Sequence, residues 1–145
     1  MKFQALTVEA GLTSQPAARH RGSAIGDLNG DGRLDVVVSA LSAPAEIWIN
    51  QSLNNNHWLE FKLQGTKSNR DGIGARIKLV TKSGAQYNHM TTSFGYASSS
   101  AGPVHFGLGP NPSADLVEIH WPSGIVQQMH DVAGDRIVVV KEPAQ

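Results

Sequence analysis

The chain has 145 residues, of which 40% are hydrophobic and 17% charged, with twelve basic residues, twelve acidic residues and no cysteine. A chain of this length forms one domain, or one domain with a small appended unit. The balanced charge argues against nucleic acid or an anionic membrane surface as a partner. The lack of cysteine excludes disulfides and thiolate chemistry. No apolar run approaches the length of a membrane span, so we expect no membrane insertion.

The first segment, MKFQALTVEAGL, has one lysine and an apolar stretch interrupted by Gln4, Thr7 and Glu9. It lacks the continuous apolar region of a signal peptide. The chain is therefore either cytosolic or a piece of a longer exported protein, extracellular or periplasmic. The motifs described below favour the exported protein.

Residues 26–40, GDLNGDGRLDVVVSA, carry oxygen-bearing side chains at alternate positions. Calcium loops take ligands from positions 1, 3, 5, 7 and 9, where position 7 contributes its backbone carbonyl and position 6 is glycine. Counted from the first aspartate, position 6 is Gly32. The five ligand positions are Asp27, Asn29, Asp31, Arg33 and Asp35.

The loop departs from an EF-hand at position 12, which is Val38 instead of the bidentate glutamate. The β-branched run Val36–Val38 indicates a buried strand, so the loop is expected to join two strands. Like charges about 4 Å apart repel by roughly 1 kcal/mol in water and by about 4 kcal/mol near a protein surface. We therefore expect a divalent cation between the carboxylates. Ca²⁺ is favoured because Mg²⁺ retains its waters.

Arg33 is expected to contribute only its carbonyl, with its side chain pointing outward. The alternative for the whole segment is a hairpin turn without metal, because Asn, Asp and Gly favour turns for local reasons.

The remaining sequence predicts strands separated by turns rich in Gly, Pro, Ser and Asn. The predicted strands are Trp58–Gln64, Arg76–Thr81, Gln86–Met90, Val117–Trp121, Ile125–Met129 and Arg136–Lys141. The predicted fold class is all-β: an antiparallel β-sandwich with an N-terminal calcium hairpin packed on it, which the resemblance described below likens to a propeller blade.

The polar run Asn50–His57 looks like a joint between a calcium-loop unit at 1–51 and a sandwich at 57–142. The first unit is too small to bury its apolar face alone. It therefore packs on the second unit or belongs to a larger array of repeats.

Several motifs resemble known families. Residues 21–51, RGSAIGDLNGDGRLDVVVSALSAPAEIWINQ, resemble an FG-GAP or VCBS-type calcium-loop repeat of β-propellers. The motifs SNRDGIGARI (68–77), GYASSS (95–100), HFGLG (105–109) and WPSG (121–124) resemble the ASPIC/UnbV domain of the cartilage-acidic-protein-like family. The resemblance implies an exported binding or adhesion protein with structural Ca²⁺ at the five loop positions named above. It carries over no catalytic motif.

Two further candidates for ligand binding stand outside the loop. In the segment Asn69, Arg70 and Asp71, the guanidinium of Arg70 offers a planar donor fork to a carboxylate or sulfate. The alternative is a tight turn that Asn69 and Asp71 tie internally. Trp58 lies on the opposite face from Leu59 and is expected to be exposed or interfacial, and with Tyr96 it could form a ligand surface.

No catalytic constellation is evident. The six histidines show no metal-ligand spacing, and no nucleophile elbow or complete dinucleotide fingerprint is present. The leading hypothesis is a non-enzymatic calcium-binding module with a binding or adhesion role and a protein or glycan ligand. A carbohydrate-binding module using exposed aromatic residues is the alternative, and a hydrolase ranks third. The oligomeric state stays open.

Overall fold

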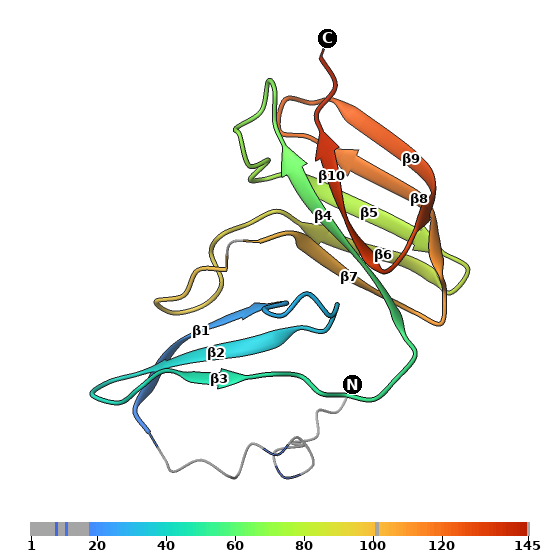
Figure 1. Ribbon diagram of the computed structural model, residues 1–145. Coiled ribbons are helices and arrows are strands. Elements are labelled where there is room, and N and C mark those ends of the chain that lie inside the picture. The colour runs from blue at the N-terminus through green and yellow to red at the C-terminus, as the bar shows by residue number, and fades with distance from the viewer. Residues whose placement is uncertain (1–7, 9–10, 12–17, 101, 145) are drawn as a thin grey trace.

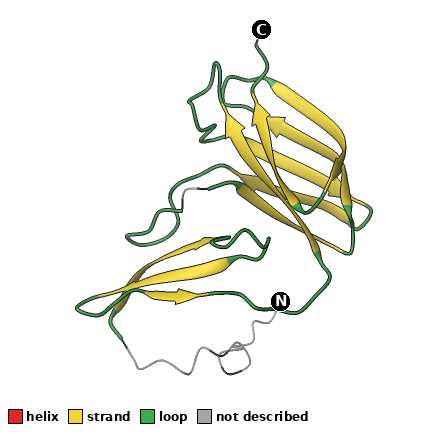
Figure 2. Cartoon of the chain, viewed as in Figure 1, coloured by secondary structure: helices red, strands yellow, loops and turns green. Residues whose placement is uncertain are grey.

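The computed structural model describes residues 8, 11, 18–100 and 102–144, and the regular structure within them is entirely β (Figures 1 and 2). Most of the N-terminal segment considered above lies outside these residues. The strands are β1 (His20–Gly26), β2 (Asp35–Ala40), β3 (Glu46–Trp48), β4 (His57–Gln64), β5 (Arg76–Thr81), β6 (Gly84–His89), β7 (Val104–Gly109), β8 (Ser113–His120), β9 (Val126–Ala133) and β10 (Arg136–Lys141). This part of the chain contains no helix with the length and apolar character needed to cross a membrane.

The strands form three sheets, in the orders β1-β2-β3, β10-β4-β7 and β6-β5-β8-β9. The last two pack face to face as the expected β-sandwich, so the predicted fold class is confirmed. One pair differs from the antiparallel expectation. β10 runs parallel to β4, with Arg136 opposite Leu59 and Lys141 opposite Gln64.

The core lies between the two larger sheets and follows the alternation of the sequence. Alternate residues of β4, β5 and β8 are fully buried: Leu59, Phe61, Ile77, Leu79, Val117 and Ile119. Phe61 meets Phe106 of β7 edge to face, with ring centroids 5.9 Å apart. Burial of each such side chain contributes about 1.5–3 kcal/mol relative to exposure. The sandwich therefore has a substantial core of its own.

Side-chain amides connect the two larger sheets along one side. Gln86 Nε2 of β6 donates to the carbonyl of Gly107 at 2.7 Å, and Asn88 Nδ2 donates to the carbonyl of His105 at 3.1 Å. These carbonyls belong to β7, at the edge of its sheet. The amides therefore satisfy backbone groups that an edge strand would leave open.

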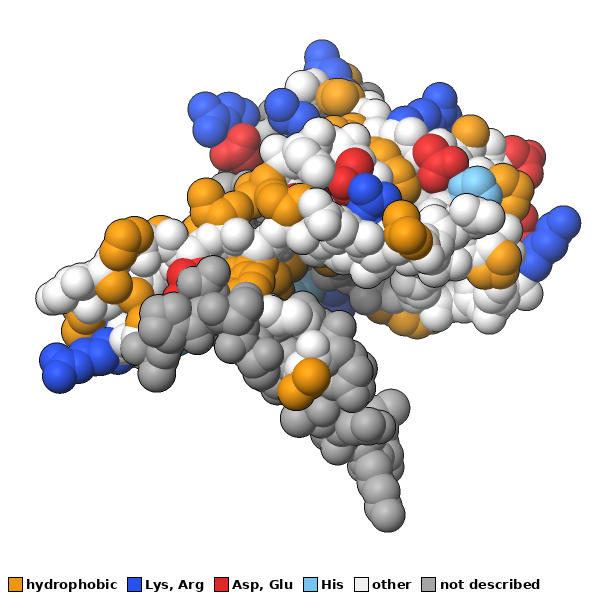
Figure 3. Space-filling model, turned by 60° about the horizontal axis from the view of Figure 1, so that its bottom comes forward, with side chains coloured by type: hydrophobic (Ala, Val, Ile, Leu, Met, Phe, Trp, Pro, Cys, Tyr) orange, Lys and Arg blue, Asp and Glu red, His pale blue; other side chains and the backbone are white. Residues whose placement is uncertain are grey.

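The sheet β1-β2-β3 lies beside the sandwich (Figure 1). It is thin and leaves apolar side chains uncovered: Ile25, Leu41 and Ile47 are more than half exposed. Figure 3 shows hydrophobic side chains at the surface of this part of the molecule. A three-stranded sheet with so little burial depends on neighbouring structure for its stability.

Glu142, just after β10, is only 1% exposed and joins three distant segments. Its Oε2 accepts from the backbone N–H groups of Thr66, Lys67 and Ser68 at 2.7–2.8 Å. Its Oε1 accepts from the hydroxyls of Ser68 and Ser123 at 2.8 and 2.5 Å. Burial raises the pKa of this carboxyl, but the hydrogen bonds more than offset that effect and hold the pKa far below its ordinary value.

The Glu142 carboxylate generates a prediction about acid stability. A carboxyl whose folded-state pKa is depressed stabilises the fold fully above its unfolded pKa, near 4.5, and loses that contribution as the pH falls toward the folded value. We expect Glu142→Gln to lower the melting temperature at pH 7 and to flatten the fall in stability below about pH 5. Thermal melts from pH 7 to pH 3 measure both effects.

The control is Asp115→Asn at an exposed position of β8. It should leave the melting temperature and its pH profile unchanged. A Glu142→Gln protein whose stability falls with pH in parallel with the wild type would contradict the assignment.

Candidate metal centre

The loop between β1 and β2 closes around the carboxylate of Asp27. Asp27 Oδ1 accepts from the N–H groups of Gly30 at 2.7 Å and Asp31 at 3.2 Å, and Oδ2 accepts from the N–H of Gly32 at 2.7 Å. Gly30 and Gly32 have φ values of 78° and 82°, in the left-handed region that glycine adopts without a steric penalty. The glycines therefore permit the curl that points successive N–H groups at one carboxylate.

Asp35, at the first position of β2, hydrogen-bonds both the start of the loop and the segment that follows β3. It is 1% exposed. Its Oδ2 accepts from the N–H of Leu28 at 2.9 Å, and its Oδ1 accepts from the N–H of Asn50 at 2.8 Å. In the sequence, Asn50 stands near the end of the repeat-like residues 21–51 and opens the polar run Asn50–His57, and no role in the loop was predicted for it. The structure shows that it belongs to the loop, through a contact that no local pattern indicates.

The expectation that the Arg33 side chain points outward is wrong. Its Nη2 lies 2.6 Å from Asp31 Oδ2, and its Nε donates to the carbonyl of Asn50 at 2.9 Å. The backbone N–H of Arg33 also donates to Asp31, and with Asn29 and the guanidinium it lowers the pKa of Asp31. A guanidinium beside a carboxylate gains a charge-assisted hydrogen bond, which explains why it turns inward.

The oxygen atoms of the loop are of the types that Ca²⁺ takes as ligands. Counting the hydrogen bonds that they already accept shows whether each has an acceptor site left. A carboxylate has about four acceptor sites. Asp27 and Asp31 each accept three hydrogen bonds, and Asp35 accepts two. Asn29 Oδ1 accepts one. Each predicted ligand side chain therefore keeps an acceptor site for an ion.

The geometry of the loop is nevertheless that of a hydrogen-bonded turn. Within residues 8, 11, 18–100 and 102–144, no three His, Asp or Glu side chains stand close enough together to form a metal cluster. Binding an ion would require small movements of the carboxylates and release of the Asp31 oxygen that Arg33 holds.

The loop contacts the sandwich through Gly32. A Cβ atom at this position would overlap the indole of Trp58, at the start of β4. The ring of His105 on β7 lies parallel to that indole, with centroids 6.4 Å apart, and its Nε2–H donates to the carbonyl of Gly32 at 3.0 Å. The sequence left open whether Trp58 is exposed or interfacial, and the structure shows that it lies at the interface between the loop and the sandwich.

Glu60 lies on the same face of β4 as Trp58 and opposite His105. It is 4% exposed. The pKa of the Glu60 carboxyl is raised, mainly because burial disfavours the charged form. His105 opposes this shift, and the negative charge of Asp27 adds to it. The loop carboxylate of Asp27 therefore lies near enough to Glu60 to contribute to the raised pKa of Glu60.

A second contact protects the open edge of β1. Ser98 Oγ accepts from the N–H of Ser23 at 2.9 Å, and Ser100 Oγ accepts from the N–H of Ile25 at 3.3 Å. Gly22 passes so close to the carbonyl of Ala97 that a Cβ would overlap it. The GYASSS motif thus supplies hydroxyl acceptors to an edge strand.

The other candidates are not brought together with the loop. Arg70 Nε and Nη2 bond both carboxylate oxygens of Asp71 at 3.0 Å, while Asn69 exchanges two hydrogen bonds with the backbone of Ile73 at 2.8 Å. This is the internally tied turn. Tyr96 is 77% exposed on the loop between β6 and β7.

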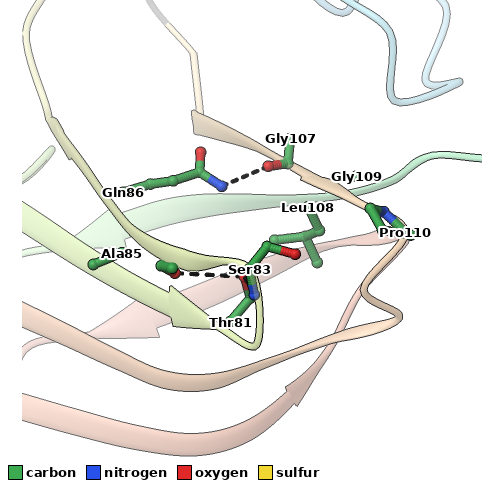
Figure 4. A pocket seen from close by; sticks show the side chains of 9 residues that line it. Thr81, Ser83, Ala85, Gln86, Gly107, Leu108, Gly109 and Pro110 are labelled. Atoms are coloured by element: carbon green, nitrogen blue, oxygen red, sulfur yellow. Dashed lines mark hydrogen bonds between the residues drawn. The ribbon is translucent and has the colours of Figure 1, made fainter.

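A small pocket of about 250 Å³ lies where the β5–β6 turn approaches the end of β7 (Figure 4). Thr81, Ser83 and Gln86 supply its polar side-chain atoms on one side, and Leu108 and Pro110 line the other. None of its lining residues carries an ionisable side chain. The pocket therefore offers no general acid or base.

The structure defines a class of protein: a short three-stranded β-sheet, closed by a hydrogen-bonded acidic loop, docked on a β-sandwich. Comparison with known families agrees with it. Residues 21–51 match the FG-GAP repeat, and residues 65–145 match ASPIC and UnbV. The chain belongs to the ASPIC and UnbV family, and the resemblance found in the sequence is confirmed.

Similar proteins include cartilage acidic protein 1 of Xenopus tropicalis, 33% identical over 118 residues that cover 79% of this chain and 18% of that protein. Cartilage acidic protein 1 of Homo sapiens is 30% identical over 125 residues, which cover 83% of this chain and 19% of that protein. The chain thus spans about a fifth of the length of these relatives.

The contact at Gly32 generates a prediction with a built-in control. Gly30 and Gly32 have similar positive φ values, but only a Cβ at Gly32 meets another residue, Trp58. Gly30→Ala should destabilise the protein by about 1–2 kcal/mol through backbone strain. Gly32→Ala should cost about 1–3 kcal/mol more, through overpacking. Urea denaturation followed by tryptophan fluorescence measures the difference. Equal destabilisation would show that the loop does not rest on Trp58.

Proposed function

We propose that this chain is a non-enzymatic, calcium-stabilised binding module of an exported protein. The ion would be held by the side chains of Asp27, Asn29, Asp31 and Asp35 and by the carbonyl of Arg33. One observation carries the proposal: these side chains follow the calcium-loop order and retain acceptor sites while the loop backbone closes around them. The chemistry supplied by the ion is neutralisation of three carboxylates, which fixes the blade.

The guanidinium of Arg33 supplies part of the positive charge that the ion would bring to the loop. It neutralises Asp31 at 2.6 Å and crosses to Asn50. An Arg side chain supplies one charge from one direction, whereas Ca²⁺ accepts six to eight oxygen atoms around it. We therefore propose that the loop is folded without the ion and is rigidified with it. When calcium binds, the guanidinium of Arg33 would release Asp31, and the backbone carbonyl of Arg33 would bind the ion.

The binding or adhesion role and the exported location rest on the family. The FG-GAP repeat and the ASPIC and UnbV family support an extracellular binding module. The matched residues make up only 18–19% of these relatives, so further repeats could cover the exposed apolar side chains of the β1-β2-β3 sheet. A sugar platform at Trp58 is less well supported, because its indole packs against Gly32.

Calcium should raise the melting temperature. A ligand that binds only the folded state stabilises it by RT ln(1 + [L]/Kd). For a Kd on the order of 10⁻⁴ to 10⁻³ M, 10 mM calcium adds about 1.4–2.7 kcal/mol, or roughly 4–10 °C in Tm. Asp31→Ala should abolish this shift, and Asp115→Ala, at an exposed site on β8, should retain it. Melts in calcium and in chelator that coincide for the wild type would refute the proposal.

Arg33→Gln should separate the roles of side chain and carbonyl. The variant keeps the carbonyl and removes the charge that neutralises Asp31. We expect it to be less stable than the wild type in chelator, because Asp31 loses a partly exposed ion pair. In saturating calcium the difference in stability between the two proteins should fall to less than half of its value in chelator. The comparison requires urea denaturation in both conditions, and a deficit that calcium leaves unchanged would contradict the exchange.

A further inference from the structure

The outer face of the four-stranded sheet carries a shallow groove of about 390 Å³. This groove is far in sequence from the calcium loop and has no assigned role. Four residues of the groove, Arg76, Lys78, Glu118 and His120, alternate with buried side chains of β5 and β8, whereas Tyr87 and His89 lie on β6, which is exposed throughout. We call it the basic groove, defined by Arg76, Lys78, Tyr87, His89, Glu118 and His120.

Strand register arranges these side chains in two rows across β6, β5 and β8. In the first row Arg76 stands between His89 and His120, and in the second Lys78 stands between Tyr87 and Glu118. Opposite side chains in an antiparallel sheet have Cβ atoms about 4.5–5.5 Å apart, and the rows are about 7 Å apart along the strands. The grid therefore has the dimensions of a small organic ligand.

The groove holds positive charge that the protein does not neutralise. Both oxygens of Glu118 are engaged, by His120 at 2.8 Å and by Gln128 at 2.7 Å. Lys78 lies near enough to Glu118 to lower its pKa, although His120 is the larger cause. Within the part of the chain that the structure describes, the guanidinium of Arg76 has no hydrogen bond or ion pair. Its planar donor fork is free to bind an oxyanion in bidentate fashion.

Tyr87 supplies a different kind of contact. Its side chain is 75% exposed beside Lys78. A large exposed ring with a polar tip is typical of a surface that binds a partly apolar, partly polar ligand. A sugar ring has this character, with an apolar C–H face and a rim of hydroxyl groups.

We propose that the basic groove binds an acidic saccharide, with Arg76 on its carboxylate or sulfate and Tyr87 against its ring. The shallow shape suits an extended chain of sugars, and side chains rather than an open strand edge line the site. The proposal names a ligand class for the binding role argued above. It does not depend on calcium, because no residue of the groove belongs to the loop at 27–35.

The test is binding of the full chain to dextran sulfate, polygalacturonate and neutral dextran, measured by calorimetry in saturating calcium. Dextran sulfate and polygalacturonate distinguish sulfate from carboxylate recognition, and neutral dextran reports any contribution from sugar alone. We expect at least one acidic polymer to bind and neutral dextran not to bind. Arg76→Gln should weaken binding about tenfold or more through loss of a charge-assisted contact. Tyr87→Ala should weaken it by a similar factor, and Tyr87→Phe should retain it.

The matched control is Arg136→Gln, which removes the same charge from β10 on the other sheet. It should leave binding unchanged. The proposal fails if neither acidic polymer binds, if Arg136→Gln weakens binding as much as Arg76→Gln, or if a phosphopeptide library binds this face and the saccharides do not. The calcium proposal is judged separately, by the melting temperature of the Asp31→Ala protein, so each can fail without the other.

Discussion

Closure of the β1–β2 loop on its own carboxylates is the interaction on which the candidate site depends. Backbone N–H groups converge on Asp27, and Asp35 joins the start of the loop to Asn50 at the end of the repeat. These bonds hold the carboxylates of Asp27 and Asp35 in one short loop with Asp31, where like charges repel without compensation. Arg33 provides part of that compensation, and the proposed ion would provide the rest.

The same turn connects the blade to the sandwich. Gly32 leaves no space between the loop and the indole of Trp58, and His105 holds the Gly32 carbonyl. On the other side of the blade, hydroxyls of the 98–100 segment occupy the edge of β1. The blade exposes much of its apolar surface and has little core of its own. Its position thus rests on a few polar and close-packed contacts, of which those at Gly32 reach both β4 and β7.

Local pattern was sufficient for most of the strands, although it missed β3 and β7. Alternation in Trp58–Gln64 predicted which residues enter the core, because side chains in a strand point to opposite faces. Contacts between distant segments could not be predicted in this way. The inward turn of Arg33, the parallel pairing of β10 with β4 and the burial of Glu142 each depend on residues far apart in sequence. The basic groove likewise appears only when register places β6, β5 and β8 side by side.

Terbium luminescence would test the central claim most directly, because Tb³⁺ replaces Ca²⁺ in oxygen sites and is excited by a nearby indole. Trp58 lies against the loop at Gly32. Bound terbium should therefore emit strongly when tryptophan is excited, calcium should suppress the emission competitively, and Trp58→Phe should reduce it more than Trp48→Phe does. If no sensitised emission appeared, or if calcium failed to displace it, the loop would be a hydrogen-bonded turn without an ion.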